Sequence, residues 1–255
     1  MLVINKKRIK IITAGVLVAI FTFTFQIAMK QGNPLNTNIA NENKTNTNNQ
    51  SVQTTATPVS GKTVVLDAGH GVPDEGAQSS NGTTEAQTNL KIALKVQNLL
   101  EQSGCNVILT RSDENAIYDL DAQTLKQKKI SDIHNRVKIG NESSADIFVS
   151  IHLNKIPQSQ YYGWQCFFKS GSEDSIKLAK KIQENLNKSI QKENTRVPMK
   201  LDTVYIMKHV EIPISIVECG FLSNPEEEKQ LLNDDYQNRL SWGIYNGITS
   251  YFYEK

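Results

Sequence analysis

The stretch TVVLDAGHG, residues 63–71, decides the fold class of this chain. It opens with a short apolar run that contains β-branched residues, which is typical of a strand buried on both faces of a sheet. Gly69 and Gly71 flank His70 and allow both a sharp turn and the close approach of a ligand. The stretch therefore predicts a buried strand that ends at a histidine.

Two later stretches repeat this form. ADIFVSIHLN, residues 145–154, places His152 at the end of an apolar run, and ISIVECGFLSN, residues 214–224, places Glu218 there. If the three runs are parallel strands of one sheet, their last side chains meet at the edge where open α/β sheets hold their active sites. We expect His70, His152 and Glu218 to converge at that edge.

The rest of the domain alternates between strand and helix patterns. An apolar run at 106–109 predicts another buried strand, and GWQCFFK at 163–169 and TVYIMK at 203–208 are expected to be further strands. Helical spacing of apolar residues predicts a helix through 92–100 that stops before Gly104, one beginning near Ser131, one over 176–190 and one over 234–251. This alternation predicts an α/β fold: a single domain with a mostly parallel twisted sheet and helices on both faces.

The first sixty residues differ from the rest of the chain. Four basic residues between positions 6 and 10 precede an apolar run over 11–28, an asymmetry that predicts a start inside the cytoplasm and export of the residues after the run. We expect residues 1–30 to be an uncleaved membrane anchor, with a cleaved signal peptide as the alternative. Residues 31–61 are rich in Asn, Thr, Gln and Ser, which predicts a disordered linker. Residues 62–255 are then the folded domain, outside the membrane.

Composition narrows the choice of partners. The chain has 255 residues and a formal net charge of only +2, so nothing indicates a nucleic-acid partner. Its three cysteines are an odd and widely spaced set, which argues against a disulfide framework. We expect Cys105 and Cys166 to be small buried side chains of strands.

Histidines supply two of the candidate functional residues, although each has a plainer interpretation. His70 could be polar surface in a loop, and His152 could be a core histidine with its hydrogen bonds satisfied. His134 falls in a predicted helix and His209 in a polar loop, and both are expected to be ordinary surface residues.

Carboxylates supply the other two candidates. Glu85 follows Thr84, which with Gln87 has the form of a capping box, so Glu85 could simply favour the helix dipole. Glu218 is harder to explain in this way, because it follows an apolar run, where a carboxylate must find a partner. The neighbouring Cys219 is expected to point to the opposite face, which leaves a cysteine nucleophile only a weak alternative.

Together these residue types suggest metal chemistry. Two imidazoles and one carboxylate form a ligand set for zinc, and such catalytic sites leave a fourth position open for water. A second carboxylate can take a proton from that water and pass it to a leaving nitrogen. The spacing alone supports a metal hydrolase only in outline, because these residues form no compact motif such as H-E-x-x-H.

Several long motifs in order resemble those of a known family, the zinc-dependent N-acetylmuramoyl-L-alanine amidases of the third amidase type, which cut bacterial peptidoglycan. The resemblance runs from about residue 62 to the carboxyl end. The motifs that carry it are VVLDAGHG, DEGA at 74–77, the glutamate Glu85, VILTR ending at Arg111, ADIFVSIHLN and IPISIVECGFLSNPEE.

The resemblance implies a role for each candidate. By position, His70, Glu85 and His152 are similar to the zinc ligands of the family and Glu218 to its catalytic glutamate. It also implies the bond that is cut, the amide between the lactyl group of N-acetylmuramic acid and the first L-alanine of the stem peptide.

Three features set this chain apart from the usual family pattern. Val72 and Glu75 stand where the family usually has glycine and proline, which changes the loop beside the implied metal without removing a ligand. Only ten residues separate His152 from Gly163, where regulated relatives insert a long helix that blocks the site.

Such an anchored amidase without a lid resembles those that modify spore cortex peptidoglycan, where removal of stem peptides allows muramic lactam to form. This implies a role in sporulation and germination, in the forespore or cortex space. Because neither a lid nor an appended wall-binding repeat is seen, we hypothesise that timed expression or an activating protein partner controls the enzyme.

Two rival functions stay open from the sequence. One is another exported zinc amidase or peptidase with a different bond specificity. The other is a catalytically inert cell-wall-binding module that keeps the fold, which the presence of all four site residues disfavours.

Overall fold

Residues 56–254 are described by the computed structural model, so the predicted membrane anchor and most of the predicted linker lie outside the described residues. Packing begins before residue 62, since Val59 is fully buried and the Thr57 hydroxyl donates a hydrogen bond to the Ser103 carbonyl. Within residues 56–254, no helix combines the length and the apolarity that crossing a membrane requires.

A six-stranded sheet of order β2-β1-β3-β6-β4-β5 lies at the centre of the domain. Its strands are β1 (Thr63–Ala68), β2 (Asn106–Leu109), β3 (Ile147–Asn154), β4 (Gln165–Phe168), β5 (Met199–Lys200) and β6 (Ile214–Phe221). All neighbouring pairs are parallel except β4 with β6, which is antiparallel. The mostly parallel sheet confirms the predicted fold class. The strands β2, β1, β3 and β6 run in the same direction, so their carboxyl ends lie at one edge of the sheet.

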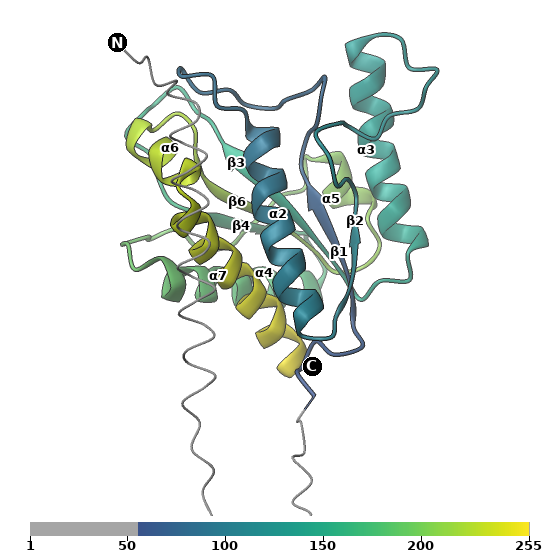
Figure 1. The fold of residues 1–255 in the computed structure, drawn as a ribbon. Helices are drawn as coiled ribbons and strands as arrows, with labels where there is room; N and C mark the ends of the chain where they lie inside the picture. The colour runs from purple at the N-terminus through teal and green to yellow at the C-terminus, as the bar shows by residue number, and fades with distance from the viewer. Residues whose placement is uncertain (1–55, 255) are drawn as a thin grey trace, which may run out of the picture. The chain divides into compact units, whose positions relative to one another are not determined.

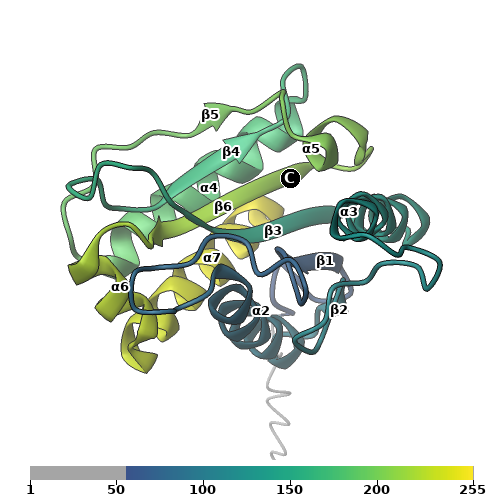
Figure 2. The same ribbon diagram turned by 90° about the horizontal axis from the view of Figure 1, so that it is seen from above.

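Helices cover both faces of this sheet. They are α2 (Glu85–Gln102), α3 (Leu125–Glu142), α4 (Glu173–Ile190), α5 (Tyr205–His209), α6 (Pro225–Leu232) and α7 (Asp234–Tyr253). Helices α2, α4 and α7 supply a large hydrophobic core on one face, and α3 and α5 supply a smaller core on the other. Figures 1 and 2 show α3 and α5 grouped together, away from α2 and α7.

Helices α4 and α7 pack closely because α7 carries two glycines one turn apart. A Cβ atom added at Gly243 would lie 2.9 Å from the Cα of Leu186, and one added at Gly247 would overlap the backbone of Ile182. Ile182 and Leu186 are themselves fully buried. The glycines therefore let the backbones of α4 and α7 approach closely, and both helices contribute to the larger core on one face of the sheet.

Several local expectations are wrong. TVYIMK is not a strand, because α5 begins at Tyr205 and packs Ile206 and Met207 into the smaller core. His209 is therefore the last residue of a helix, not part of a loop, although it is exposed as expected. Cys105 lies just before β2 instead of within it, although it is buried.

Two further corrections concern helix starts. Helix α3 begins at Leu125, earlier than Ser131, because Thr124 and Gln127 form a true capping box there. Thr84 is the N-cap residue of α2 with an extended backbone, but its side chain makes no capping hydrogen bond.

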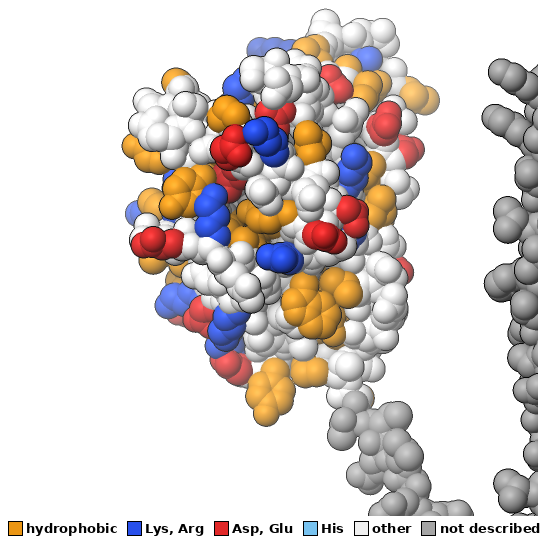
Figure 3. Space-filling view, turned by 60° about the vertical axis from the view of Figure 1, so that its left-hand side comes forward, with side chains coloured by type: hydrophobic (Ala, Val, Ile, Leu, Met, Phe, Trp, Pro, Cys, Tyr) orange, Lys and Arg blue, Asp and Glu red, His pale blue; other side chains and the backbone are white. Residues whose placement is uncertain are grey.

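The outer surface near α6 and α7 mixes side-chain types. Figure 3 shows apolar side chains as separate groups among lysine, arginine, aspartate and glutamate of this face. Trp242 on α7 is half exposed, as is Leu232 at the end of α6. Both signs of charge are interspersed, which agrees with the small net charge of the sequence.

Candidate metal centre

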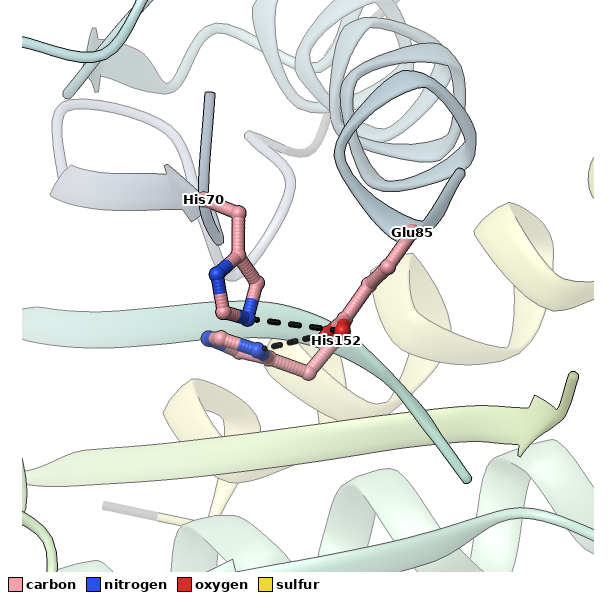
Figure 4. Close-up of side chains that lie close together, drawn as sticks. All are labelled: His70, Glu85 and His152. Atoms are coloured by element: carbon pink, nitrogen blue, oxygen red, sulfur yellow. Dashed lines mark hydrogen bonds and ion pairs between the residues drawn. The ribbon is translucent and has the colours of Figure 1, made fainter. Parts of the chain in front are cut away.

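Three of the predicted site residues come together at the carboxyl edge of the sheet. His70 follows β1, Glu85 is the first residue of α2, and His152 lies near the end of β3, and Figure 4 shows their side chains pointing toward one another. Glu85 places Oε1 3.0 Å from His152 Nδ1 and Oε2 3.4 Å from His70 Nε2. One potential ligand atom from each residue lies within 4.8 Å of the others, and residues 56–254 hold no second group of this kind.

Glu218 is the fourth predicted residue, and β-sheet register places it beside the other three. It pairs directly with His152 across β3 and β6, and directly paired residues carry their side chains on the same face. Burial raises the pKa of Glu218 to about 7, with a smaller opposing effect from His152. Its Oε2 atom is buried without a hydrogen-bond partner, so this oxygen is free to accept a proton.

Cys219 points away from this group. It is fully buried in the larger core, on the opposite face of β6, where burial raises the pKa of its thiol well above the usual value. The alternative of a Cys219 nucleophile acting with His152 is therefore wrong. Cys166 is likewise buried, and all three cysteines are free.

Two glycines make room for the cluster. A Cβ atom at Gly69 would overlap the imidazole ring of His152. At Gly76, which has a φ of +71°, a Cβ atom would lie 2.6 Å from Glu85 Oε2 and 2.7 Å from His70 Cδ2. Only a residue without a side chain fits at either position, which gives a physical reason for glycine in both the DAGHG and DEGA motifs.

Backbone and side-chain groups orient Glu85. The backbone N–H of Ala77 donates to its Oε2 atom at 2.9 Å, and the backbone N–H of Leu153 donates to its Oε1 atom at 3.1 Å. Glu85 is only 4% exposed. Burial alone would raise the pKa of Glu85, but hydrogen bonds to the two histidines lower it, so the carboxylate is ionised.

Asp74 holds the other ring nitrogen of His70. Its Oδ2 atom lies 3.3 Å from His70 Nδ1, and its Oδ1 atom lies 2.8 Å from Nζ of Lys129 on α3. Although burial opposes both shifts, the contacts with Asp74 and Glu85 raise the pKa of His70 to about 9, and those with His70 and Lys129 lower the pKa of Asp74 to about 2. With Asp74 at Nδ1, the Nε2 atom of His70 faces Glu85. A carboxylate on the second ring nitrogen commonly fixes the orientation of a metal-binding histidine.

A buried ion pair supports the turn that carries His70. Arg136 on α3 pairs with Asp67 on β1 and also donates to the backbone carbonyls of Ala68 and His70. His70 has a φ of +63°, which is uncommon for a residue other than glycine, so its turn needs such external support. Despite the cost of burial, Arg136 lowers the pKa of Asp67.

Arg111 holds the same turn from the other side. Its guanidinium donates to the carbonyls of Ala68 and Gly69, and to that of Ala86 on α2. It therefore connects the strand end that carries His70 with the helix start that carries Glu85.

Reasoning from the sequence missed most of this supporting layer. Arg111 stands in a recognised motif, but no role followed from the motif alone. Arg136 gives no signal, because a basic residue in an amphipathic helix is ordinarily exposed. The signal that could have been used is Asp67, since a carboxylate inside a buried strand requires a cationic partner.

The cluster fits a zinc ion. Two imidazoles and one carboxylate with donor atoms this close match a three-residue zinc site with a fourth position left open. Glycines at 69 and 76 leave room around the donors, and hydrogen bonds hold the remaining atoms of Glu85 and His70. A bound zinc ion would supply Lewis-acid polarisation and would lower the pKa of water.

Comparison with known proteins identifies the family. A family model described as N-acetylmuramoyl-L-alanine amidase matches residues 64–250. The chain belongs to this amidase family. The amidase hydrolyses the bond between N-acetylmuramic acid and L-alanine in peptidoglycan, which confirms the resemblance seen in the sequence.

Individual relatives agree with this assignment. The amidase is 36% identical over 208 residues to the germination-specific N-acetylmuramoyl-L-alanine amidase of Bacillus subtilis (strain 168), covering 82% of this chain and 87% of the relative. The CwlD amidase from Clostridioides difficile, solved in complex with the GerS lipoprotein, matches with a TM-score of 0.74 and 43% identity over 76% of this chain and 100% of that one. The catalytic domain of CwlV from Bacillus (Paenibacillus) polymyxa var. colistinus matches with a TM-score of 0.65 and 31% identity over 76% of this chain and 99% of that one.

Proposed function

We propose that the amidase is zinc-dependent, that His70, Glu85 and His152 hold the ion, and that Glu218 is the general base. The observation that carries this proposal is the unpartnered Oε2 atom of Glu218, buried on the strand next to His152. A carboxyl group with a pKa near neutrality is suited both to take a proton from the attacking water and to return it to the leaving amine. The other groups of the site orient these four side chains.

Three variants test this division of roles. His70→Ala is expected to lose both bound zinc and turnover, whereas Glu218→Gln is expected to keep zinc and lose turnover. His134→Ala is the matched control, since His134 is an exposed histidine on α3. Zinc content by metal analysis and release of stem peptides with an amino-terminal L-alanine by mass spectrometry are the two measurements. Normal turnover in Glu218→Gln would overturn the assignment of the base.

We further propose that the amidase acts in spore cortex maturation, outside the cytoplasmic membrane. The support is the germination-specific name of the Bacillus subtilis relative and the basic and apolar pattern of residues 1–30. Spores that lack the gene are expected to lack muramic lactam, and complementation with Glu218→Gln is expected not to restore it. Normal muramic lactam in the deletion strain would contradict the cortex role, while cell fractionation tests the membrane anchor.

A protein partner is also part of this proposal. The CwlD relative was solved in complex with a lipoprotein, and we propose that a partner of similar kind activates this amidase. Turnover of the purified enzyme is expected to rise when the partner is added. Full activity on wall sacculi without any added protein would argue against an obligatory activator.

A further inference from the structure

Beyond the candidate metal centre, a second group of polar residues lies at the same edge of the sheet. Strand β4 runs antiparallel to β6, so its first residue, Gln165, pairs with Glu218. The segment 191–198 crosses this end of β4, since the Gln165 side chain donates to the Val197 carbonyl and the Asn194 side chain donates to the Trp164 carbonyl. These contacts bring Arg196 to the side of the site opposite His70.

Arg196 is half-buried and incompletely paired. Its Nε donates to the Tyr162 carbonyl at 3.1 Å, and its Nη1 donates to Gln165 Oε1 at 3.2 Å. The guanidinium also lies over the Phe221 ring, 4.6 Å from the ring centroid. No carboxylate among residues 56–254 lies within ion-pair distance of Arg196, although Glu227 is close enough to interact with it electrostatically. The Nη2 atom of Arg196 forms no hydrogen bond with the described residues.

Arg196 is one of the residues that line a hollow of about 390 Å³. Tyr161, Tyr162 and Asn194 line it together with Arg196, and Glu193, which is exposed, is a further lining residue. Its volume falls in the range of sites that take small ligands. A guanidinium with a free N–H group is suited to bind a carboxylate, and aromatic walls are suited to the apolar parts of a peptide.

The position of the hollow indicates which part of the substrate it would meet. Paired residues on neighbouring strands have Cβ atoms about 5 Å apart, so Arg196, one side chain beyond Gln165, is on the order of 10 Å from the Glu218 carboxylate. An extended peptide advances about 3.4 Å per residue, so the second or third stem residue lies at this distance from the bond that is cut.

We propose that Arg196 and the hollow beside it form a subsite for a free carboxylate of the peptide stem, the α-carboxylate of the second residue. This residue is joined to the third through its γ-carboxyl group, which leaves the α-carboxyl group either free or amidated. The inference rests on the proposed site of reaction beside Glu218. It makes the enzyme selective for stems in which that carboxyl group is free.

A matched pair of substrates tests the subsite. N-acetylmuramoyl-L-alanyl-D-glutamate with its γ-carboxyl group blocked as a methylamide, and the α-amide of the same compound, differ only in the charge that Arg196 would meet. A charge-assisted hydrogen bond contributes about 1.5–3 kcal/mol, so the zinc-loaded full-length enzyme is expected to favour the acid by about 10–100-fold in kcat/KM, mainly through KM. Arg196→Gln is expected to remove this preference, because kcat/KM for the acid falls to that for the amide. Arg196→Lys, which keeps the charge but lacks the planar fork, is expected to retain part of it.

Lys192→Gln is the control within the same segment. Lys192 lies over the Tyr162 ring at 4.1 Å but does not line the hollow, so its loss is expected to change the preference by less than about twofold. Equal losses on acid and amide in Arg196→Gln would overturn the proposal and leave Arg196 only a role in holding the loop. A preference for the acid that persists in Arg196→Gln would also overturn the proposal.

A binding measurement separates this inference from the proposed mechanism. In the Glu218→Gln background, calorimetric binding of the acid is expected to be tighter than that of the amide by the same factor, and Arg196→Gln is expected to abolish the difference. If Glu218→Gln keeps full activity, the mechanism fails but the acid-to-amide ratio still tests the subsite. If both substrates bind equally well, the subsite fails while the mechanism stands.

Discussion

The two faces of the central sheet differ most at their carboxyl ends. On the face covered by α2, α4 and α7, apolar side chains continue to the end of every central strand, as Ala68, Leu153 and Cys219 show. On the face covered by α3 and α5, the strands begin with apolar residues such as Val65 and Phe148 and end with polar ones. The first face buries more apolar surface and stabilises the fold, whereas the second carries the polar side chains of the site at its strand ends.

Alternation along each strand produces this difference. In β1, Val65 is followed two residues later by Asp67, and in β6 Ile216 is followed two residues later by Glu218. β3 continues the pattern from Phe148 through Ser150 to His152. Because residues two apart share a face, the change from apolar to polar takes place on one face only.

Substitutions at two neighbouring residues of β6 test most directly whether the two faces of the sheet have separate roles. Glu218→Gln is expected to lower kcat by about 10²- to 10⁴-fold, because a general base is lost, while thermal stability is kept or raised. Cys219→Ala, one residue along and on the other face, is expected to lower the free energy of unfolding by about 1 kcal/mol and to leave kcat nearly unchanged. Steady-state kinetics and thermal unfolding of both variants measure these two effects. A large loss of turnover in Cys219→Ala would show that the faces are not separate.

The buried ion pair on the polar face is expected to give the next largest effect. Asp67→Asn leaves the buried Arg136 with Asp132 as its remaining carboxylate partner and is expected to lower the free energy of unfolding by about 3–5 kcal/mol. Urea unfolding measures this loss. A change below about 1 kcal/mol would mean that Asp132 and the carbonyls of Ala68 and His70 suffice to hold Arg136.

The same variant has a characteristic pH dependence. Despite burial, the ion pair with Arg136 lowers the pKa of Asp67 in the folded protein, so its contribution is present above the unfolded pKa of about 3.9 and is lost as pH falls through the folded value. The stability difference between the wild type and Asp67→Asn is therefore expected to stay constant near neutrality and to shrink below about pH 4. A difference that grows in acid would contradict the assignment.

Leu186→Ala probes the apolar face far from the site. Leu186 is fully buried between α4 and α7, and its truncation is expected to lower the free energy of unfolding by about 2–5 kcal/mol. At a temperature where the variant is folded, kcat/KM is expected to match that of the wild type. A parallel loss of zinc affinity would indicate that the two faces are energetically coupled.

Asp74→Asn is expected to give the smallest effect, and it tests whether the polar face supports zinc binding. Loss of the carboxylate beside His70 Nδ1 is expected to weaken zinc binding by about 10–100-fold, with little change in stability. Competition with a zinc chelator measures the affinity. Lys129→Gln is the control, because it removes the partner of Asp74 and keeps the contact with His70, and it is expected to have a smaller effect.

Much of this architecture follows from local patterns in the sequence. The buried strands β1, β3 and β6, the helix over 234–251 and the stop signal at Gly104 are confirmed, because apolar periodicity and glycine act over a few residues. The run at 106–109 forms a strand as predicted, but β2 lies at the edge of the sheet and is only partly buried. The expected strand at 203–208 failed because a short apolar run fits a helix as well as a strand, and packing against α3 selected the helix. The early start of α3 was available in the sequence as the Thr124 and Gln127 capping box.

The sequence by itself determined the fold class and brought forward His70, Glu85, His152 and Glu218, because strand ends and side-chain types are local properties. Only the tertiary structure decided which groups surround them. Asp67 and Arg136 are 69 residues apart, and Arg196 meets Gln165 across 31 residues, so neither contact has a local signature. Such contacts arise when separate segments pack, and their geometry depends on the whole sheet. That packing places the unpaired oxygen of Glu218 and the free N–H of Arg196 on the same side of one domain.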